Sequence, residues 1–225
     1  MNKNPSEELR RKLIEKNGLD QITNLDMVAI SELHEFEKKE YLIRLEVPSQ
    51  YLYFLVEGEV TVTHDSFDKT ICVNYNQPLS WLGEAASLWR QQPNCNVQAL
   101  TPCTCVAIDL WKYREALIND LLFLQNTCQL LSLRLNDSTK ALTDLLEPLE
   151  IRLAKFILRY ASEDVFALQL TNCAFILNAS YRHLLRIMKE FCRKGFLHKQ
   201  KNIYLIKNRS ALEAYAAGNI PAKLD

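Results

Sequence analysis

The hydrophobic pattern of this sequence changes its period once, near Asp109. Between about Leu33 and Asp109, short apolar runs separated by Gly, Pro or polar residues predict β-strands. The predicted strands are Tyr41–Ile43, Tyr51–Val56, Val60–Thr63, Thr70–Val73 and Cys105–Ile108. After Asp109 the apolar residues recur at steps of three and four, which is helical spacing. A chain of 225 residues with this change predicts an α+β fold, with a β domain first and helices after it.

The β region is expected to form an N-terminal domain over residues 1–109, leading helices included. Many short strands at this spacing favour a jelly roll, with a closed barrel as the alternative. Gly58 and the polar segment 65–69 are turn signals between consecutive apolar runs. We therefore expect an adjacent hairpin at each of these two places.

A heptad pattern follows, and it predicts a long dimerisation helix over residues 110–147. The seam of apolar and small residues suggests that this helix pairs with a second copy of itself in a homodimer. A long helix packed only on its own β domain is the alternative. Pro148 marks the helix boundary, because it lacks an N–H and disfavours helix in the residue before it. The candidate interface residues are Leu121, Leu124, Cys128, Leu131, Leu135 and Leu142, with Ser138 as a polar member of the seam.

Residues 148–225 have the pattern of a winged helix-turn-helix. Helices are expected over 150–161, 171–177 and 180–194, with Ser180 as the N-cap of the last and Gly195 at its end. That last helix has an apolar back and a basic front, as a DNA recognition helix requires. Apolar runs on both sides of 199–202 predict a hairpin, or wing. The candidate DNA-binding residues are Ser180, Tyr181, Arg182, His183, Arg186, Lys189, Arg193, Lys199 and Lys201.

Charge is divided unevenly along the chain. Residues 1–147 hold 14 Lys and Arg against 21 Asp and Glu, whereas residues 148–225 hold 13 against 6. The formal charges of −7 and +7 indicate that the C-terminal part meets a polyanion such as double-stranded DNA. Arg182 and Arg186 lie near the start of the recognition helix, and an arginine can donate two hydrogen bonds to a guanine, so these two are expected to specify bases. Contacts to phosphates are expected from Lys189, Arg193, Lys199 and Lys201.

The remaining features predict a cytoplasmic protein without a metal centre. The N-terminal residues lack the apolar core of a signal peptide, and no stretch has the pattern of a membrane span. Seven cysteines without a C-x-x-C pair fit reduced thiols better than a disulfide framework or a closed metal site.

The sequence resembles the CRP/FNR superfamily of bacterial transcription regulators over nearly its whole length. The motifs are 51–60, Leu82-Gly83-Glu84, and 180–186 followed by Gly195-Phe196-Leu197. Within the superfamily, 180–185 and 204–209 are most similar to the YeiL-type branch. The resemblance implies a cyclic-nucleotide-binding-like jelly roll and a homodimer that binds a two-fold-related DNA site and contacts RNA polymerase.

The resemblance also implies an effector pocket, with departures from the family pattern. Gly83 and Glu84 begin the phosphate-binding cassette, and Ser138 and Thr139 fall where the family offers hydroxyls to adenine. Cyclic-AMP binders have an Arg-Ser or Arg-Thr pair in the stretch that corresponds to Gln92–Asn96, which contains Asn94 and Cys95 and no arginine. Losing that charge-assisted phosphate contact makes ordinary cAMP binding doubtful. In the recognition helix, Arg186 matches the family's guanine-reading arginine. The family usually has a glutamate on the base-reading face, and this chain has Arg182 near that position instead. We therefore expect a half-site sequence different from the family's familiar one.

The cysteines offer a second kind of signal. The first cysteine is Cys72, so the N-terminal iron–sulfur cluster of FNR-type sensors is absent in its usual form. A thiol-based signal from a Cys128 pair across the dimer, or ligation by some of Cys95, Cys103 and Cys105, is the leading hypothesis. Buried small side chains are the alternative explanation.

Two further functions compete with a signal-controlled regulator. One is a constitutive DNA-binding regulator whose effector domain is degenerate. The other is a small-molecule enzyme on a cupin-like β domain, which is disfavoured because the β region offers only His34 and His64 as imidazole ligands. We therefore expect a protein that is not an enzyme.

Overall fold

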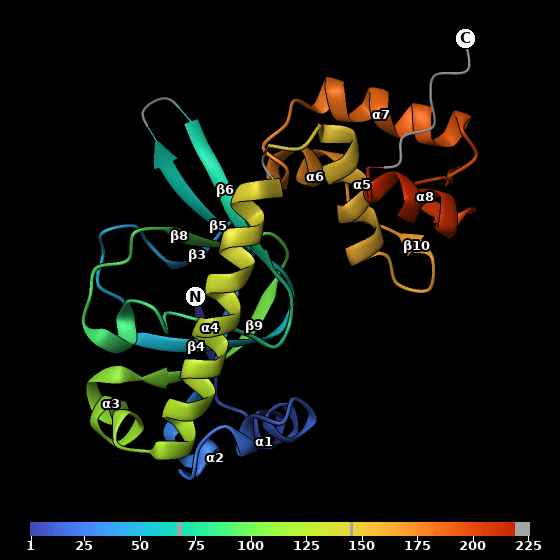
Figure 1. Ribbon diagram of the computed structural model, residues 1–225. Coiled ribbons are helices and arrows are strands. Elements are labelled where there is room, and N and C mark those ends of the chain that lie inside the picture. The colour runs from blue at the N-terminus through green and yellow to red at the C-terminus, as the bar shows by residue number, and fades with distance from the viewer. Residues whose placement is uncertain (67–68, 145, 219–225) are drawn as a thin grey trace. The chain divides into compact units, whose positions relative to one another are not determined.

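The computed structural model describes residues 1–66, 69–144 and 146–218, and the side chains of Ser66 and of residues 140–144 lie outside the description (Figure 1). The chain divides into two compact units, Met1–Asn136 and Asp137–Asp225. Each unit is described by itself.

The first unit contains two antiparallel sheets, and the α+β fold is confirmed. The five-stranded sheet has the order β1-β2-β9-β4-β7 and the four-stranded sheet the order β3-β8-β5-β6, so the strands do not close into a barrel. The strands are β1 (Asn2–Asn4), β2 (Ser31–Phe36), β3 (Tyr41–Ile43), β4 (Tyr51–Glu57), β5 (Val60–Ser66), β6 (Lys69–Asn76), β7 (Ser80–Leu82), β8 (Asn96–Ala99) and β9 (Cys103–Asp109).

Both faces of the five-stranded sheet are buried. Tyr53 and Leu55 of β4 pack between the two sheets, while Leu52 and Phe54 pack against helices on the other face. This explains why β4 is apolar at successive positions instead of alternating. The covering elements are α1 (Glu7–Lys16), α2 (Met27–Ile30), α3 (Leu110–Ile118) and the first half of α4 (Leu121–Asp144), with 3₁₀ turns η1 (Leu19–Gln21) and η2 (Ser87–Trp89).

One of the two predicted hairpins is correct and the other is wrong. β5 pairs with β6 across 66–69, as predicted. The strands that flank Gly58 do not pair: β4 belongs to one sheet and β5 to the other. Gly58 has φ +88°, and a Cβ there would overlap the carbonyl oxygen of Pro102. Glycine is therefore required where the chain passes close to Pro102 as it crosses from one sheet to the other. In the sequence, such a crossing has the same strand–turn–strand pattern as a hairpin.

The change of period is confirmed, but the single helix predicted over 110–147 is wrong, because α3 ends at Ile118 and a second helix, α4, begins at Leu121, where Asp120 anchors its start. The carboxylate of Asp120 accepts hydrogen bonds from the Leu122 N–H at 3.1 Å, from Asn24 and from the Thr23 hydroxyl. Phe123 and Thr127 are buried against the β domain, and Figure 1 shows the helix crossing that domain. The first half of α4 is thus fixed to its own β domain along one face.

The second unit contains four helices after α4 and a small sheet among its described residues. The helices are α5 (Leu149–Tyr160), α6 (Leu170–Ile176), α7 (Tyr181–Arg193) and α8 (Arg209–Ala216). The sheet has the order β10-β12-β11, with β11 (Leu197–Gln200) and β12 (Ile203–Ile206) as the predicted wing and β10 (Val165–Phe166) added at its edge. The segment 162–167, between two of the predicted helices, thus contributes a two-residue strand.

Candidate functional site

The helix α7 is positioned by its caps and by its buried face. The Ser180 hydroxyl accepts a hydrogen bond from the His183 N–H at 3.2 Å, and Gly195 has φ +74° just beyond the end of the helix. Leu184, Ile187, Met188 and Phe191 are buried. The N-cap, the end and the apolar stripe all lie where the sequence predicted them.

Every candidate DNA-binding residue lies on the exposed side of this unit. Arg186 is 67% exposed and His183 is 43% exposed at the side chain. Steps of four, three and four place Arg182, Arg186, Lys189 and Arg193 along one stripe of α7. The complete exposed set is Ser180, Tyr181, Arg182, His183, Arg186, Lys189, Arg193, Lys199 and Lys201.

The turn before α7 is fixed by an arginine that the sequence did not single out. Arg152 of α5 donates from Nη2 to the carbonyl oxygen of Leu177 at 3.0 Å. The N–H of Ala179 donates to the carbonyl oxygen of Ala174, which closes the turn between α6 and α7. These bonds hold the start of α7 at a defined direction relative to α5 and α6.

The wing is a two-stranded hairpin with a two-residue turn. Leu197 pairs with Ile206 and Gln200 pairs with Ile203, which leaves Lys201 and Asn202 at the tip. Lys199 therefore lies in β11 rather than at the tip, and its side chain is exposed. Both lysines remain available to a polyanion.

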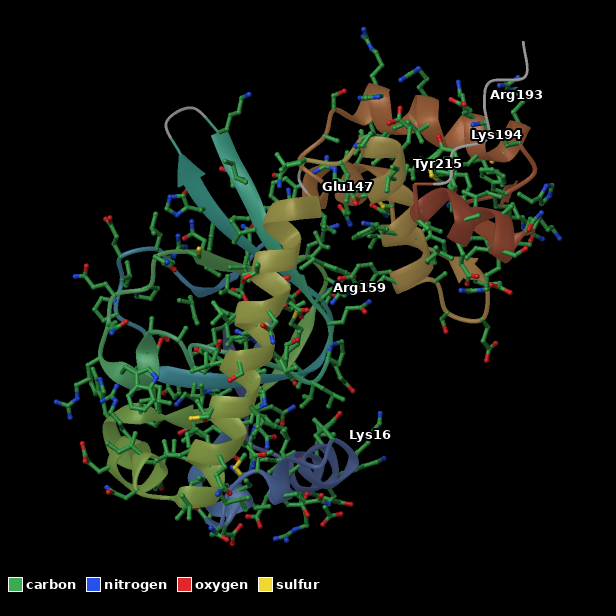
Figure 2. All side chains as sticks on the ribbon, in the orientation of Figure 1. Lys16, Glu147, Arg159, Arg193, Lys194 and Tyr215 are labelled. Carbon is green, nitrogen blue, oxygen red and sulfur yellow. The ribbon has the colours of Figure 1, made fainter. Side chains whose placement is uncertain are left out.

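Aromatic packing joins the end of α7 to α8. The ring of Phe191 lies 5.4 Å from that of Tyr215, and Phe196 lies 5.8 Å from Phe191. The ammonium of Lys194 lies 4.9 Å from the centre of the Tyr215 ring, whereas Arg193 is exposed (Figure 2). Lys194 is thus part of the packing, and Arg193 belongs to the basic stripe.

One carboxylate contacts the predicted DNA-reading surface. Oε1 of Glu150, in the first turn of α5, lies 3.8 Å from Nη2 of Arg186 and 3.8 Å from Nε2 of His183. Within the described residues, Arg182, Lys189, Arg193, Lys199 and Lys201 have no ion pair with a carboxylate. Glu150 therefore partly neutralises one end of the stripe, a contact that spacing along α7 alone does not reveal.

In the first unit, the predicted effector pocket begins at a buried ion pair. Glu84 is 2% exposed, and its carboxylate accepts a hydrogen bond from Nη1 of Arg134 in α4. Nη2 of the same guanidinium donates to the carbonyl oxygen of Trp81 at 2.7 Å. Burial raises the pKa of Glu84, and Arg134 opposes that shift. Gly83 precedes this pair with φ +97°, and a Cβ there would lie 3.1 Å from Ser87 Oγ, so the backbone turn favours glycine.

The other predicted pocket residues are more exposed. Asn94 is exposed, and its carbonyl oxygen lies 2.8 Å from Nδ1 of His64. Cys95 is half-buried, and burial raises the pKa of its thiol. Ser138 and Thr139 are exposed residues of α4 beyond Asn136, in the second unit. Their place in a pocket with Gly83 and Glu84 stays a prediction.

The candidate redox cysteines differ sharply in access. Cys103 and Cys105 are buried in β9, and burial raises the pKa of both thiols. Because the thiolate is the reactive form, neither has the environment of a reactive cysteine. Cys128 is exposed on α4. Over the described ranges, no group of three His, Cys, Asp or Glu side chains is arranged to hold a metal ion.

The predicted dimer seam lies on the outer face of α4. Leu121 is 68% exposed and Leu135 is 69% exposed, while Leu124 and Leu131 are half-buried. The side chain of Leu142 lies outside the described residues. The helix thus packs on its β domain with one face and leaves Leu121 and Leu135 exposed, and the pairing of the seam with a second copy stays a prediction. Within the described parts of the chain, none of the helices has the length and hydropathy of a membrane crossing.

Comparisons with known proteins cover both units. A family model described as cyclic nucleotide-binding domain matches residues 33–120. Over 193 residues the chain is 31% identical to regulatory protein YeiL of Escherichia coli O157:H7, which covers 85% of this chain and 88% of that protein.

Solved structures share the fold. FixK2 from Bradyrhizobium japonicum superposes with a TM-score of 0.73 at 16% identity, covering 82% of this chain and 96% of that one. TTHA1359, a transcriptional regulator of the CRP/FNR family from Thermus thermophilus, has a TM-score of 0.68 at 18% identity, covering 83% and 98%. At these identities the two structures show the shared fold alone.

Proposed function

Because the chain belongs to the CRP/FNR family of transcriptional regulators, we propose that it is a cytoplasmic homodimer that binds a palindromic double-stranded DNA site and regulates transcription there. The observation that supports this most strongly is the exposed basic stripe of α7 above a fully buried apolar face. Contact with RNA polymerase rests on the family resemblance alone.

The stripe suggests a division of roles among its side chains. Arg182 and Arg186 can each donate two hydrogen bonds to O6 and N7 of guanine in the major groove. Ser180, Tyr181 and His183 lie at the start of the same helix. Lys189, Arg193, Lys199 and Lys201 are placed to neutralise phosphates on either side of the groove.

The dimer is proposed to form through α4. Its leucines at heptad spacing, of which Leu121 and Leu135 are exposed, are typical of a helix that pairs with its own copy. Two copies related by a two-fold axis would present two α7 helices to two half-sites about one helical turn apart. In this scheme residues 1–109 form the sensor domain, 110–147 the dimerisation helix, and 148–225 the DNA-binding domain.

The signal at the β domain is proposed not to be ordinary cAMP. The segment from Gln92 to Asn96 contains no arginine, and the guanidinium that reaches Glu84 is already paired with it. Among thiols, exposed Cys128 on the seam fits a redox signal better than buried Cys103 or Cys105. A constitutive regulator with a degenerate sensor domain is the second candidate, supported by the apolar residues that pack between the two sheets.

The role is proposed to be non-enzymatic. The relative that establishes the family is named a regulatory protein. His34 and His64, the two imidazoles of the β region, lie on different sheets, and His34 is engaged by Glu32 at 3.1 Å. This arrangement disfavours the convergent ligand set of a cupin-like enzyme.

The test is selection of genomic DNA fragments by the purified protein, run in parallel under reducing and oxidising conditions. We expect a palindrome with half-sites about one helical turn apart. A difference between the two runs that disappears in Cys128→Ser would place the signal on that thiol. No enrichment by the protein in either run, with fragments recovered equally by Arg182→Ala/Arg186→Ala, would contradict the proposal.

A further inference from the structure

We propose that the first unit binds a small organic oxyanion in a cavity formed by η2, α3 and the loop before β4. The cavity has a volume of about 390 Å³, within the range of small-ligand sites. Its lining includes Ser49, Gln91 and Trp111 together with two arginines, Arg90 and Arg114. This inference does not depend on DNA binding.

Arg114 supplies a fixed guanidinium. Its Nε donates to the carbonyl oxygen of Leu88 at 3.0 Å, and its Nη2 donates to that of Ser87 at 2.9 Å. Burial and the nearby charge of Arg90 lower the pKa of Arg114, Glu115 opposes that shift, and an arginine stays protonated at neutral pH. Neither Ser87 nor Leu88 supplies a negative charge, and no carboxylate within the described residues lies in ion-pair distance of Arg114. A bound oxyanion would supply a carboxylate or phosphate in direct contact with Arg114, where Glu115 acts only from a greater distance.

Arg90 adds a second, movable cation at the edge of the cavity. Its side chain is 71% exposed, and Nη2 lies 3.5 Å from Oε1 of Glu115, which is equally exposed. An exposed pair at this distance contributes little, so a ligand oxyanion can replace Glu115 as the partner of Arg90 at small cost.

Trp111 gives the cavity a flat apolar wall. It lies in the first turn of α3 and is 78% exposed, although large apolar side chains are usually covered. The combination of a pre-positioned guanidinium, a second cation and an open indole fits a molecule with a carboxylate or phosphate on a planar body.

The ion pair of Glu84, a few residues before Arg90, is a poorer place for such a ligand. There Glu84 is buried and already paired with Arg134, so an incoming anion would meet a carboxylate and a neutralised cation. The arginines that line the cavity carry no such buried countercharge, which favours the cavity as the anion site.

Binding is tested on the full chain at low salt, by calorimetry for every probe and by tryptophan fluorescence for the nucleotide probe, because indole-3-acetate is itself fluorescent. The probes are adenosine 5′-monophosphate and indole-3-acetate, which carry a phosphate and a carboxylate, and adenosine, which carries neither. We expect at least one of the two anions to bind with a Kd below about 1 mM, and adenosine not to bind. The anion that binds identifies the oxyanion.

Two exposed substitutions locate the site. Arg90→Gln should weaken binding about tenfold, the effect of one charge-assisted contact, and Trp111→Ala should abolish the fluorescence change. Lys112→Gln is the control. It removes an exposed cation that lies next to Trp111 in α3 but does not line the cavity, so this variant should bind the anion as the unsubstituted chain does. The inference is overturned if neither anion binds at about 5 mM, or if binding survives both Arg90→Gln and Trp111→Ala unchanged.

Discussion

At the scale of single residues, the buried pair of Glu84 and Arg134 links the β domain to α4. A buried carboxylate is tolerated only with a partner, and this one has the guanidinium of a helix fifty positions further along the chain. The sequence pointed to Glu84 through its motif. It gave no sign of Arg134, because a single arginine beside a heptad seam reads as a solvent-facing residue.

Replacing Arg134 should therefore lower the stability of the folded protein, by an amount that depends on pH. Arg134→Gln leaves the Glu84 carboxylate buried without a cation, which we expect to lower the free energy of unfolding at pH 7 by about 3–5 kcal/mol. Burial already raises the pKa of Glu84, so the folded state takes up its proton more readily than the unfolded state. The destabilisation should shrink as the pH falls toward the unfolded pKa of about 4.3.

Urea denaturation at several pH values measures this effect. Arg11→Gln is the control, since it breaks an exposed ion pair with Glu7 and should cost less than about 1 kcal/mol. The double variant Glu84→Gln/Arg134→Gln should recover much of the loss. If the double variant is no more stable than Arg134→Gln alone, the buried charge is not the cause.

Glu150 offers a second prediction for a single side chain. Its carboxylate lies near Arg186 and His183, so Glu150→Gln should tighten DNA binding, by about twofold for an exposed contact of this kind. Glu147→Gln removes a carboxylate that pairs with Lys155 instead, and serves as the matched control. Anisotropy titrations that show equal changes for the two variants would assign the effect to net charge and not to this contact.

At the scale of elements, the pattern of hydrophobic residues predicted most of what forms. It located the long helix, three helices of the second unit and seven strands, the two of the wing included, because burial on one face or on both leaves a clear period. It did not single out β1, β7, β8 and β10, which have two to four residues, or β2, which mixes polar and apolar side chains. The hairpin that it predicted at Gly58 is wrong, because the sheet to which a strand belongs depends on contacts distant in sequence.

The helix α4 provides a matched pair of leucines for testing the dimer. Leu135 lies on the seam and Leu133 lies off it, and they are 69% and 64% exposed. Leu135→Gln should shift the protein from dimer to monomer at micromolar concentration, whereas Leu133→Gln should leave the dimer intact. Sedimentation velocity distinguishes the two states, and equal behaviour of the two variants would contradict a heptad interface.

At the scale of the whole molecule, charge divides along the chain. Residues 1–147 have a formal charge of −7 and residues 148–225 one of +7, so a polyanion is attracted by one part and repelled by the other. The sequence alone predicted this division, and every candidate DNA-binding residue that it named is exposed. It did not predict the cavity beside Arg90 and Arg114, because three segments distant in sequence enclose it.

The most direct test of the central claim is the affinity of Arg186→Ala and Lys189→Ala for the selected palindrome and for a copy with its half-site guanines replaced. If Arg186 reads a base, its loss should cost about 1–3 kcal/mol on the palindrome and remove the preference between the two DNAs. Lys189→Ala should weaken binding to both DNAs alike and reduce the salt dependence by about one unit of slope. Equal affinity of the unsubstituted chain for the two DNAs, or no loss on removing Arg186, would contradict sequence-specific binding through α7.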